Sequence, residues 1–287
     1  MPKQIEESGI FQIVSEYRRM EMQLPLIGLG TWELRGAECT KVVKLALELG
    51  YRHFDTAHAY ENHKAIRSGI KGFDRSALFL TSKIALDEQV KSSKIEQSVQ
   101  KACAQALKEL GTDYLDLYMI HWPDRHFPLD AVFEAMQGLV DEGKVARVGV
   151  SNYNTHHLED LRKAGWVPFA NQVEFHPYLN QKELFDYCRK AGIQLISYRP
   201  FGKGKLLQEE PLFDQIGEKH GKTGAQVILR WLIQHEIAVI PKASSKKHLK
   251  ENLDVFDFAL SPRQVQQLDH IHQSKRFCQP EHPEFKY

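Results

Sequence analysis

The segment Gly50-Tyr-Arg-His-Phe-Asp-Thr-Ala-His-Ala-Tyr60 indicates the fold class, because it joins the end of a helix to a short strand. Before it, Thr40–Leu49 has apolar residues at helical spacing, and glycine commonly ends a helix. Within it, His53–Thr56 is predicted to be a short buried strand that carries Asp55. In a parallel sheet, residues just past the carboxyl ends of strands face a ligand crevice or a barrel mouth. The segment therefore predicts an α/β fold with polar residues placed at such an edge.

The same alternation recurs along the whole chain. Seven further apolar runs predict strands at Leu26–Leu29, Leu78–Lys83, Leu115–His121, Val145–Val150, Ala170–Glu174, Gln194–Tyr198 and Ala238–Pro241. Helical spacing is found between them at Ile95–Leu110, Ala131–Val140, Leu158–Lys163, Leu184–Lys190 and Ala225–Gln234. Eight strand–helix units favour a closed (β/α)8 TIM barrel over an open sheet.

The remaining stretches fit around this barrel. Gly9–Gln23 predicts a short N-terminal hairpin at the barrel bottom. Extra C-terminal helices are expected, one of them at Leu260–Asp269, before a Pro-containing tail. Because the sequence has no Pro/Gly/Ser-rich linker, residues 1–287 are predicted to form a single domain.

The composition argues against several function classes. With 38 basic and 37 acidic side chains the formal charge is +1, which does not suit a general nucleic-acid surface. The 4 cysteines are far apart and form no CxxC, so a reduced compartment is the default. No apolar run approaches the ~18–20 residues of a membrane span. The polar N-terminus, Met-Pro-Lys-Gln-Ile-Glu-Glu, does not resemble a signal peptide. We therefore expect a cytoplasmic protein without nucleic-acid or membrane partners.

Four polar residues at or after predicted strands form a coherent set for proton transfer: Asp55, Tyr60, Lys83 and His121. A phenol has a pKa near ~10, and a nearby ammonium would lower it. In this interpretation Tyr60 is the acid, Lys83 lowers its pKa, and Asp55 anchors Lys83. His121 would donate a hydrogen bond to a substrate oxygen. Each residue alone has a commoner structural explanation, such as a turn aspartate or a packed tyrosine. Together they suit protonation of a carbonyl oxygen during its reduction.

A dinucleotide-binding Gly-x-Gly-x-x-Gly motif is not found. The nearest match, Gly28-Leu-Gly30-Thr31-Trp32, lacks the third glycine and the helix that should follow. The Rossmann interpretation is therefore weak.

Seven segments together make the chain resemble the aldo-keto reductases. They are Gly50–Tyr60, Thr81-Ser-Lys-Ile84, His121-Trp-Pro123, Gly149-Val-Ser-Asn152, Asn171-Gln-Val-Glu-Phe-His-Pro-Tyr178, Ser197-Tyr-Arg-Pro-Phe-Gly202 and Ile240-Pro-Lys242. They run in family order, most like the bacterial branch that includes 2,5-diketo-D-gluconate and methylglyoxal reductases. The resemblance implies a monomeric NADPH-dependent reductase of small aldehydes and ketones, in which hydride passes from nicotinamide C4 to the carbonyl carbon. It implies no metal.

The resemblance also implies a role for each matching residue. Tyr60 would be the general acid, and Asp55, Lys83 and His121 would complete a catalytic tetrad. The implied cofactor contacts are Gly30 and Thr31 near the nicotinamide ribose, Ser151, Asn152 and Gln172 at the carboxamide, Tyr198 against the nicotinamide ring, the loop from Gly202 at the pyrophosphate, Lys242 at the 2′-phosphate, and Glu251 and Asn252 at the adenine. Trp32 and Trp122 would line the substrate pocket.

The chain departs from the family at the phosphate signature. Ala243 stands where the family usually has serine, and His248 stands where it usually has an arginine. Loss of a fixed guanidinium at His248 predicts a weaker preference for NADPH, with NADH as a second candidate cofactor.

Two other functions remain open. One is a cofactor-binding redox sensor or regulatory subunit with little turnover. The other is a metal-dependent hydrolase on the same barrel, which would need several His, Asp or Glu ligands at strand ends, whereas the present set contains a lysine and a tyrosine instead.

Overall fold

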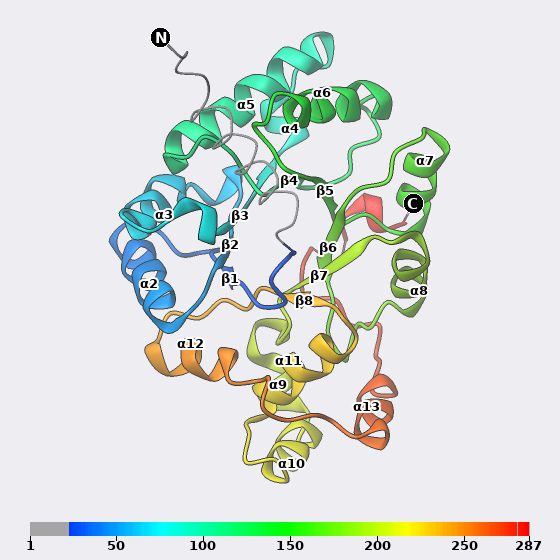
Figure 1. Cartoon of the computed structure of the whole chain (residues 1–287). Coiled ribbons are helices and arrows are strands. Elements are labelled where there is room, and N and C mark those ends of the chain that lie inside the picture. Colours follow the sequence, from blue (N-terminus) through cyan, green and yellow to red (C-terminus); the bar gives the residue numbers. More distant parts are fainter. Residues whose placement is uncertain (1–22, 280, 287) are drawn as a thin grey trace, which may run out of the picture.

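The structure, a computed structural model, describes residues 23–279 and 281–286 (Figure 1). The hairpin predicted at Gly9–Gln23 lies outside the described residues, apart from Gln23.

Eight parallel strands form one sheet in the order β1 to β8. They are β1 (Leu29–Gly30), β2 (His53–Asp55), β3 (Phe79–Ile84), β4 (Leu117–Ile120), β5 (Val148–Ser151), β6 (Ala170–Glu174), β7 (Gln194–Tyr198) and β8 (Ala238–Val239). The sheet closes on itself, since Ile27 bridges Val239 in parallel and the Gly28 N–H donates to the Val239 carbonyl at 2.8 Å. The predicted (β/α)8 barrel is confirmed.

Helices surround the strands, as the view along the barrel shows (Figure 1). The outer ring contains α2 (Gly36–Leu49), α3 (His63–Ile70), α5 (Ile95–Leu110), α6 (Leu129–Asp141), α7 (Thr155–Lys163), α8 (Lys182–Ala191), α11 (Gly224–Gln234) and α12 (Lys246–Leu253). Shorter helices are α4 (Leu86–Gln89), α9 (Lys205–Glu209) and α10 (Leu212–Glu218). The C-terminal helix predicted at Leu260–Asp269 is α13 (Pro262–Asp269).

The helix ends follow from local sequence. Gly50, after α2, and Gly111, after α5, have φ values of 106° and 67°, in the left-handed region that glycine enters without a steric penalty. At the other end of α11, Thr223 and Gln226 form a reciprocal capping box. These residues fix where α2 and α5 end and where α11 begins.

The barrel interior is packed with apolar side chains. Phe79, Leu117, Met119, Ala170 and Ile196 form one buried cluster, distinct from the larger core around it. Leu117 and Met119 alternate along β4, as expected for residues on the inner face of a strand. This packing fills the barrel and leaves its carboxyl end for polar residues.

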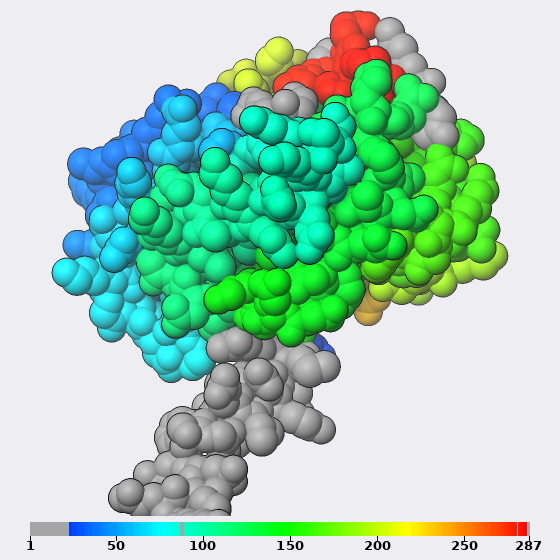
Figure 2. Space-filling view, turned by 90° about the horizontal axis from the view of Figure 1, so that it is seen from above, coloured from blue at the N-terminus to red at the C-terminus, as the bar shows by residue number. Residues whose placement is uncertain are grey.

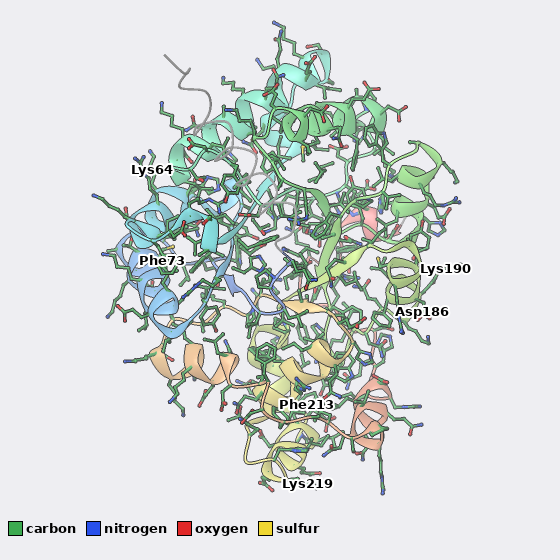
Figure 3. All side chains as sticks on the ribbon, viewed as in Figure 1. Lys64, Phe73, Asp186, Lys190, Phe213 and Lys219 are labelled. Atoms are coloured by element: carbon green, nitrogen blue, oxygen red, sulfur yellow. The ribbon has the colours of Figure 1, made fainter. Side chains whose placement is uncertain are left out.

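Charged side chains lie on the outer surface. Of the side chains labelled in Figure 3, Lys64 on α3, Lys190 on α8 and Lys219 after α10 are exposed, whereas Phe213 on α10 is buried. Figure 2 shows the C-terminal segment (red) lying at one end of the barrel. None of the helices in the described part of the chain is long and apolar enough to cross a membrane.

Candidate active site

A cavity of about 950 Å³ opens at the carboxyl end of the barrel. Its volume is at the upper end of the range of ligand-binding pockets. All eight strands contribute residues from within or just after the strand, and the tail from Phe277 onward adds one wall.

Most residues named from the sequence meet in this cavity. The predicted residues that line it are Gly30, Thr31, Trp32, Asp55, Tyr60, His121, Trp122, Ser151, Asn152, Gln172, Tyr198 and Lys242. Lys83 lies beneath the surface and is 1% exposed. Four predicted cofactor contacts are not among the described residues that line the cavity: Gly202, His248, Glu251 and Asn252. Gly202 precedes the lining residues Lys203 and Gly204, and the other three belong to α12.

Asp55 and Lys83 form a buried ion pair under the cavity floor. The Lys83 Nζ donates to Asp55 Oδ1 at 2.5 Å and to the Thr56 carbonyl at 3.0 Å. The second oxygen, Asp55 Oδ2, accepts from Gln172 Nε2 at 2.7 Å. Burial lowers the pKa of Lys83, while the Asp55 charge opposes this shift. The structure thus gives Asp55 the predicted contact with Lys83, and adds a bond from Gln172 that the sequence did not predict.

Tyr60 lies above this pair on the 3₁₀ turn His58–Tyr60 that follows β2. Its ring centroid is 5.1 Å from Lys83 Nζ and 5.7 Å from the His121 ring centroid. Trp32 packs edge-on against it at 4.9 Å. The phenol is therefore held between an indole, an imidazole and an ammonium at the edge of the cavity.

The sequence-based prediction that the pKa of Tyr60 is lowered is wrong. Burial raises this pKa well above its usual range, and the Asp55 carboxylate raises it further. The Asp55 carboxylate pairs with Lys83 at short range and offsets part of the effect of the ammonium on Tyr60. Tyr60 is consequently a neutral phenol at neutral pH and holds a proton that it can donate.

His121 is a neutral imidazole in this environment. Burial, followed by the nearby Lys83 charge, lowers its pKa to about 3. A neutral imidazole carries one N–H, so His121 can offer one hydrogen bond to a substrate oxygen. Its backbone is fixed by two bonds: the His121 N–H donates to the Ile84 carbonyl, and the His121 carbonyl accepts from Asn152 Nδ2 at 2.9 Å.

This low pKa predicts a pH dependence of stability. The folded pKa lies below the ordinary value of 6.5. Between about pH 6.5 and pH 3 the unfolded chain takes up a proton that the folded chain does not. The free energy of unfolding therefore decreases as the pH is lowered through this range. We expect His121→Gln to flatten this dependence by about 1 kcal/mol per pH unit, as measured by urea unfolding at several pH values. Parallel pH profiles for the two proteins would contradict the assignment.

Three polar side chains beside His121 form a chain of hydrogen bonds that ends on a backbone carbonyl. The Tyr198 hydroxyl donates to Asn152 Oδ1 at 2.6 Å, and Asn152 Nδ2 donates to Ser151 Oγ at 3.1 Å. The Ser151 hydroxyl in turn donates to the Gln172 carbonyl at 2.8 Å. Asn152 has φ 65°, a left-handed conformation that asparagine tolerates better than most residues. The result is a preformed set of amide and hydroxyl groups next to the ring of Tyr198, which suits a planar carboxamide ligand.

Lys242 lies at the cavity rim and pairs with Glu33, whose carboxylate Oε2 is 3.2 Å from Lys242 Nζ. Sequence reasoning missed Glu33, because its partner is 209 positions away. Glu33 follows Trp32, at the end of the segment after β1, and it also lines the cavity. The only sequence signal is its position after a predicted strand.

The tail residues His282 and Glu284 were also missed. His282 stacks on Trp122 with ring centroids 4.3 Å apart. Glu284 accepts from Arg125 at 2.9 Å and lies 2.9 Å from His157 Nε2. These contacts join parts of the chain separated by 159 and 127 positions, and no local pattern predicts them.

Within residues 23–279 and 281–286, no three His, Cys, Asp or Glu side chains come together in a way that could hold a metal ion.

Comparison with known proteins agrees with this geometry. Residues 26–273 match the profile of the Aldo/keto reductase family. Glyoxal reductase of Bacillus subtilis is 43% identical over 259 residues, which cover 89% of this chain and 91% of that protein. Among solved structures, an aldo-keto reductase from a deep-sea metagenome library has a TM-score of 0.82 at 38% identity, covering 89% of this chain and 94% of that one. A putative 2,5-diketo-D-gluconic acid reductase B has a TM-score of 0.81 at 34% identity, covering 89% and 93%. This chain therefore belongs to the aldo/keto reductase family of carbonyl-reducing oxidoreductases.

Proposed function

We propose that the chain is an NADPH-dependent reductase of small aldehydes and ketones, with Tyr60 as the general acid. The observation that carries the proposal is the position of Tyr60. It is a protonated phenol at the cavity edge, above the Asp55–Lys83 pair and beside the neutral His121. The likeness to glyoxal reductase of Bacillus subtilis supports small dicarbonyl compounds as the substrate class.

The residues that would hold the dinucleotide line the cavity next to His121 and at its rim. Ser151, Asn152 and Gln172 bring hydroxyl and amide groups to the cavity wall, where we expect the carboxamide, and Tyr198 offers an aromatic face. Lys242 offers the cation for a phosphate at the rim. When bound, NADPH supplies a hydride to the carbonyl carbon.

Side chains of the protein then supply the proton. As the carbonyl carbon accepts the hydride pair, negative charge develops on its oxygen, and the Tyr60 O–H donates its proton there. The N–H of the His121 imidazole ring donates a hydrogen bond to the same oxygen and orients it. The Lys83 ammonium stabilises the phenolate that Tyr60 becomes, until a solvent proton restores it.

The direct test is a substrate panel with purified protein and each reduced dinucleotide. Methylglyoxal, 2,5-diketo-D-gluconate, an aromatic aldehyde and a steroid ketone span the relevant sizes and polarities. We expect loss of the reduced-nicotinamide absorbance with the small dicarbonyl compounds first. Absence of turnover with every compound would contradict the proposal.

Cofactor choice gives a second prediction. Lys242→Met should raise the KM for NADPH about tenfold and leave that for NADH almost unchanged, because the lysine interacts with the additional phosphate. The measurement is kcat/KM for both dinucleotides in the wild type and the variant. A wild type that uses NADH as well as or better than NADPH would overturn the choice of NADPH.

Three sequence-based expectations remain predictions: a cytoplasmic location, a monomeric state, and a single domain over residues 1–287.

A further inference from the structure

The barrel seam brings two loops together at the cavity rim. The Gly30 N–H donates to the Pro241 carbonyl at 3.3 Å. A Cβ atom at Gly30 would lie 2.4 Å from the Ile240 carbonyl oxygen, so only glycine allows this approach. The segment after β1 therefore runs against the segment after β8. This places the Glu33 carboxylate 3.2 Å from the Lys242 ammonium.

The loop that carries Glu33 is fixed rather than free. The buried Asn62 donates from Nδ2 to the Thr31 carbonyl and to the Leu34 carbonyl, each at 3.0 Å. The Leu34 N–H donates to the Thr31 carbonyl at 3.0 Å and closes a turn around Glu33. Glu33 itself has φ 66°, in the left-handed region. The carboxylate thus projects from an ordered turn beside Lys242.

The residues that follow Lys242 in the chain offer little to a bound phosphate. Ala243 is buried and has no hydroxyl. The Ser245 hydroxyl accepts from the His248 N–H at 3.2 Å and caps α12. Ser244, Lys246 and Lys247, which follow Ala243, are exposed and are not among the described residues that line the cavity. Lys242 is therefore a cation that a 2′-phosphate would have to share with Glu33.

We propose that Glu33 is a specificity-determining residue for the dinucleotide, which weakens selection of the 2′-phosphate form by pairing with Lys242. This inference rests on the proposed function. A 2′-phosphate that approaches Lys242 meets the negative charge of Glu33. A ribose 2′-hydroxyl is not repelled, and carboxylates accept hydrogen bonds from that hydroxyl in other dinucleotide sites. Glu33 therefore reduces the difference between the affinities of this chain for NADPH and for NADH.

The size of the effect follows from exposure. Both side chains are about half exposed, at 54% for Glu33 and 41% for Lys242, so water screens their charges. Removing one such charge next to a phosphate should change affinity about three- to tenfold.

The test measures affinity rather than turnover. Dissociation constants for NADPH and NADH are obtained from quenching of intrinsic tryptophan fluorescence, since Trp32 and Trp122 line the cavity. We expect Glu33→Gln to lower the dissociation constant for NADPH about three- to tenfold, with that for NADH unchanged or raised. Glu33→Asp keeps the charge and should retain a wild-type ratio of the two constants.

A matched control is Glu61→Gln. Glu61 is exposed and pairs with Arg35 at 3.3 Å, so this change alters net charge equally, and neither residue is among the described ones that line the cavity. The wild-type ratio is expected for this variant.

Two results would overturn the inference while leaving the proposed function intact. One is that both dissociation constants stay unchanged in Glu33→Gln. The other is an equal rise in both constants, which would mean that Glu33 only stabilises the rim. If neither dinucleotide binds to the wild type, the proposed function itself fails.

Discussion

Replacing Tyr60 with Phe is expected to lower kcat for methylglyoxal reduction by about 10²- to 10⁴-fold, the usual contribution of a positioned general acid. The substitution removes one hydroxyl and retains the ring that packs against Trp32 and His121. Without that hydroxyl, the developing alkoxide has no proton donor at this position. The measurement is steady-state turnover at saturating NADPH.

The control for this experiment is Tyr178→Phe. Tyr178 is buried and is not among the described residues that line the cavity, so its loss of a hydroxyl should leave kcat unchanged. The dissociation constant for NADPH should also stay the same in Tyr60→Phe. Near-normal turnover of Tyr60→Phe with normal NADPH binding would refute the assignment of Tyr60 as the acid.

Replacing Lys83 with Met is expected to lower the free energy of unfolding by about 3–5 kcal/mol, because it leaves the buried Asp55 carboxylate without its cation. Gln172 Nε2 would remain as a hydrogen-bond donor to Asp55, but an amide carries no charge to offset the carboxylate. Urea unfolding at neutral pH measures this loss. Turnover should fall as well, since the phenolate of Tyr60 loses a nearby cation.

Two comparisons isolate burial as the cause. Lys182 and Asp186 also lie 2.5 Å apart, but both are exposed, and Asp186 is labelled on α8 in Figure 3. Lys182→Met should therefore lower the free energy of unfolding by less than about 1 kcal/mol. Adding Asp55→Asn to Lys83→Met should recover part of the lost stability, since the unpaired charge is then gone. Equal losses of unfolding free energy in Lys83→Met and Lys182→Met would show that burial of the Asp55–Lys83 pair does not increase the cost of breaking it.

Much of the barrel could be predicted from the sequence because its signals are local. The bounds predicted for β6, β7 and α5 agree with the structure, since each is an apolar run or a periodic segment with clear ends, such as Gly111 after α5. The first strand was predicted at Leu26–Leu29, but β1 is Leu29–Gly30. Ile27 forms only an isolated bridge to Val239, and that pairing depends on how the barrel closes.

The site was predicted in part, for a similar reason. Asp55 is the last residue of β2, Tyr60 and His121 follow strands, and parallel strands bring such residues to one end of a barrel. The bond between Gln172 and Asp55 spans 117 positions, and the pair of Glu33 and Lys242 spans 209, so no sequence pattern contains them. The direction of the Tyr60 pKa shift was predicted wrongly, because it depends on burial and on the Asp55 carboxylate that pairs with Lys83.

The most direct test of the central claim is a single turnover observed by stopped flow. The protein with bound NADPH is mixed with methylglyoxal, and the reduced-nicotinamide absorbance is followed in the wild type and in Tyr60→Phe. If Tyr60 protonates the carbonyl oxygen during hydride transfer, the wild type should oxidise its NADPH rapidly, and the variant should do so about 10²- to 10⁴-fold more slowly. Slow oxidation in both proteins, with NADPH tightly bound, would contradict the account and favour a cofactor-binding sensor.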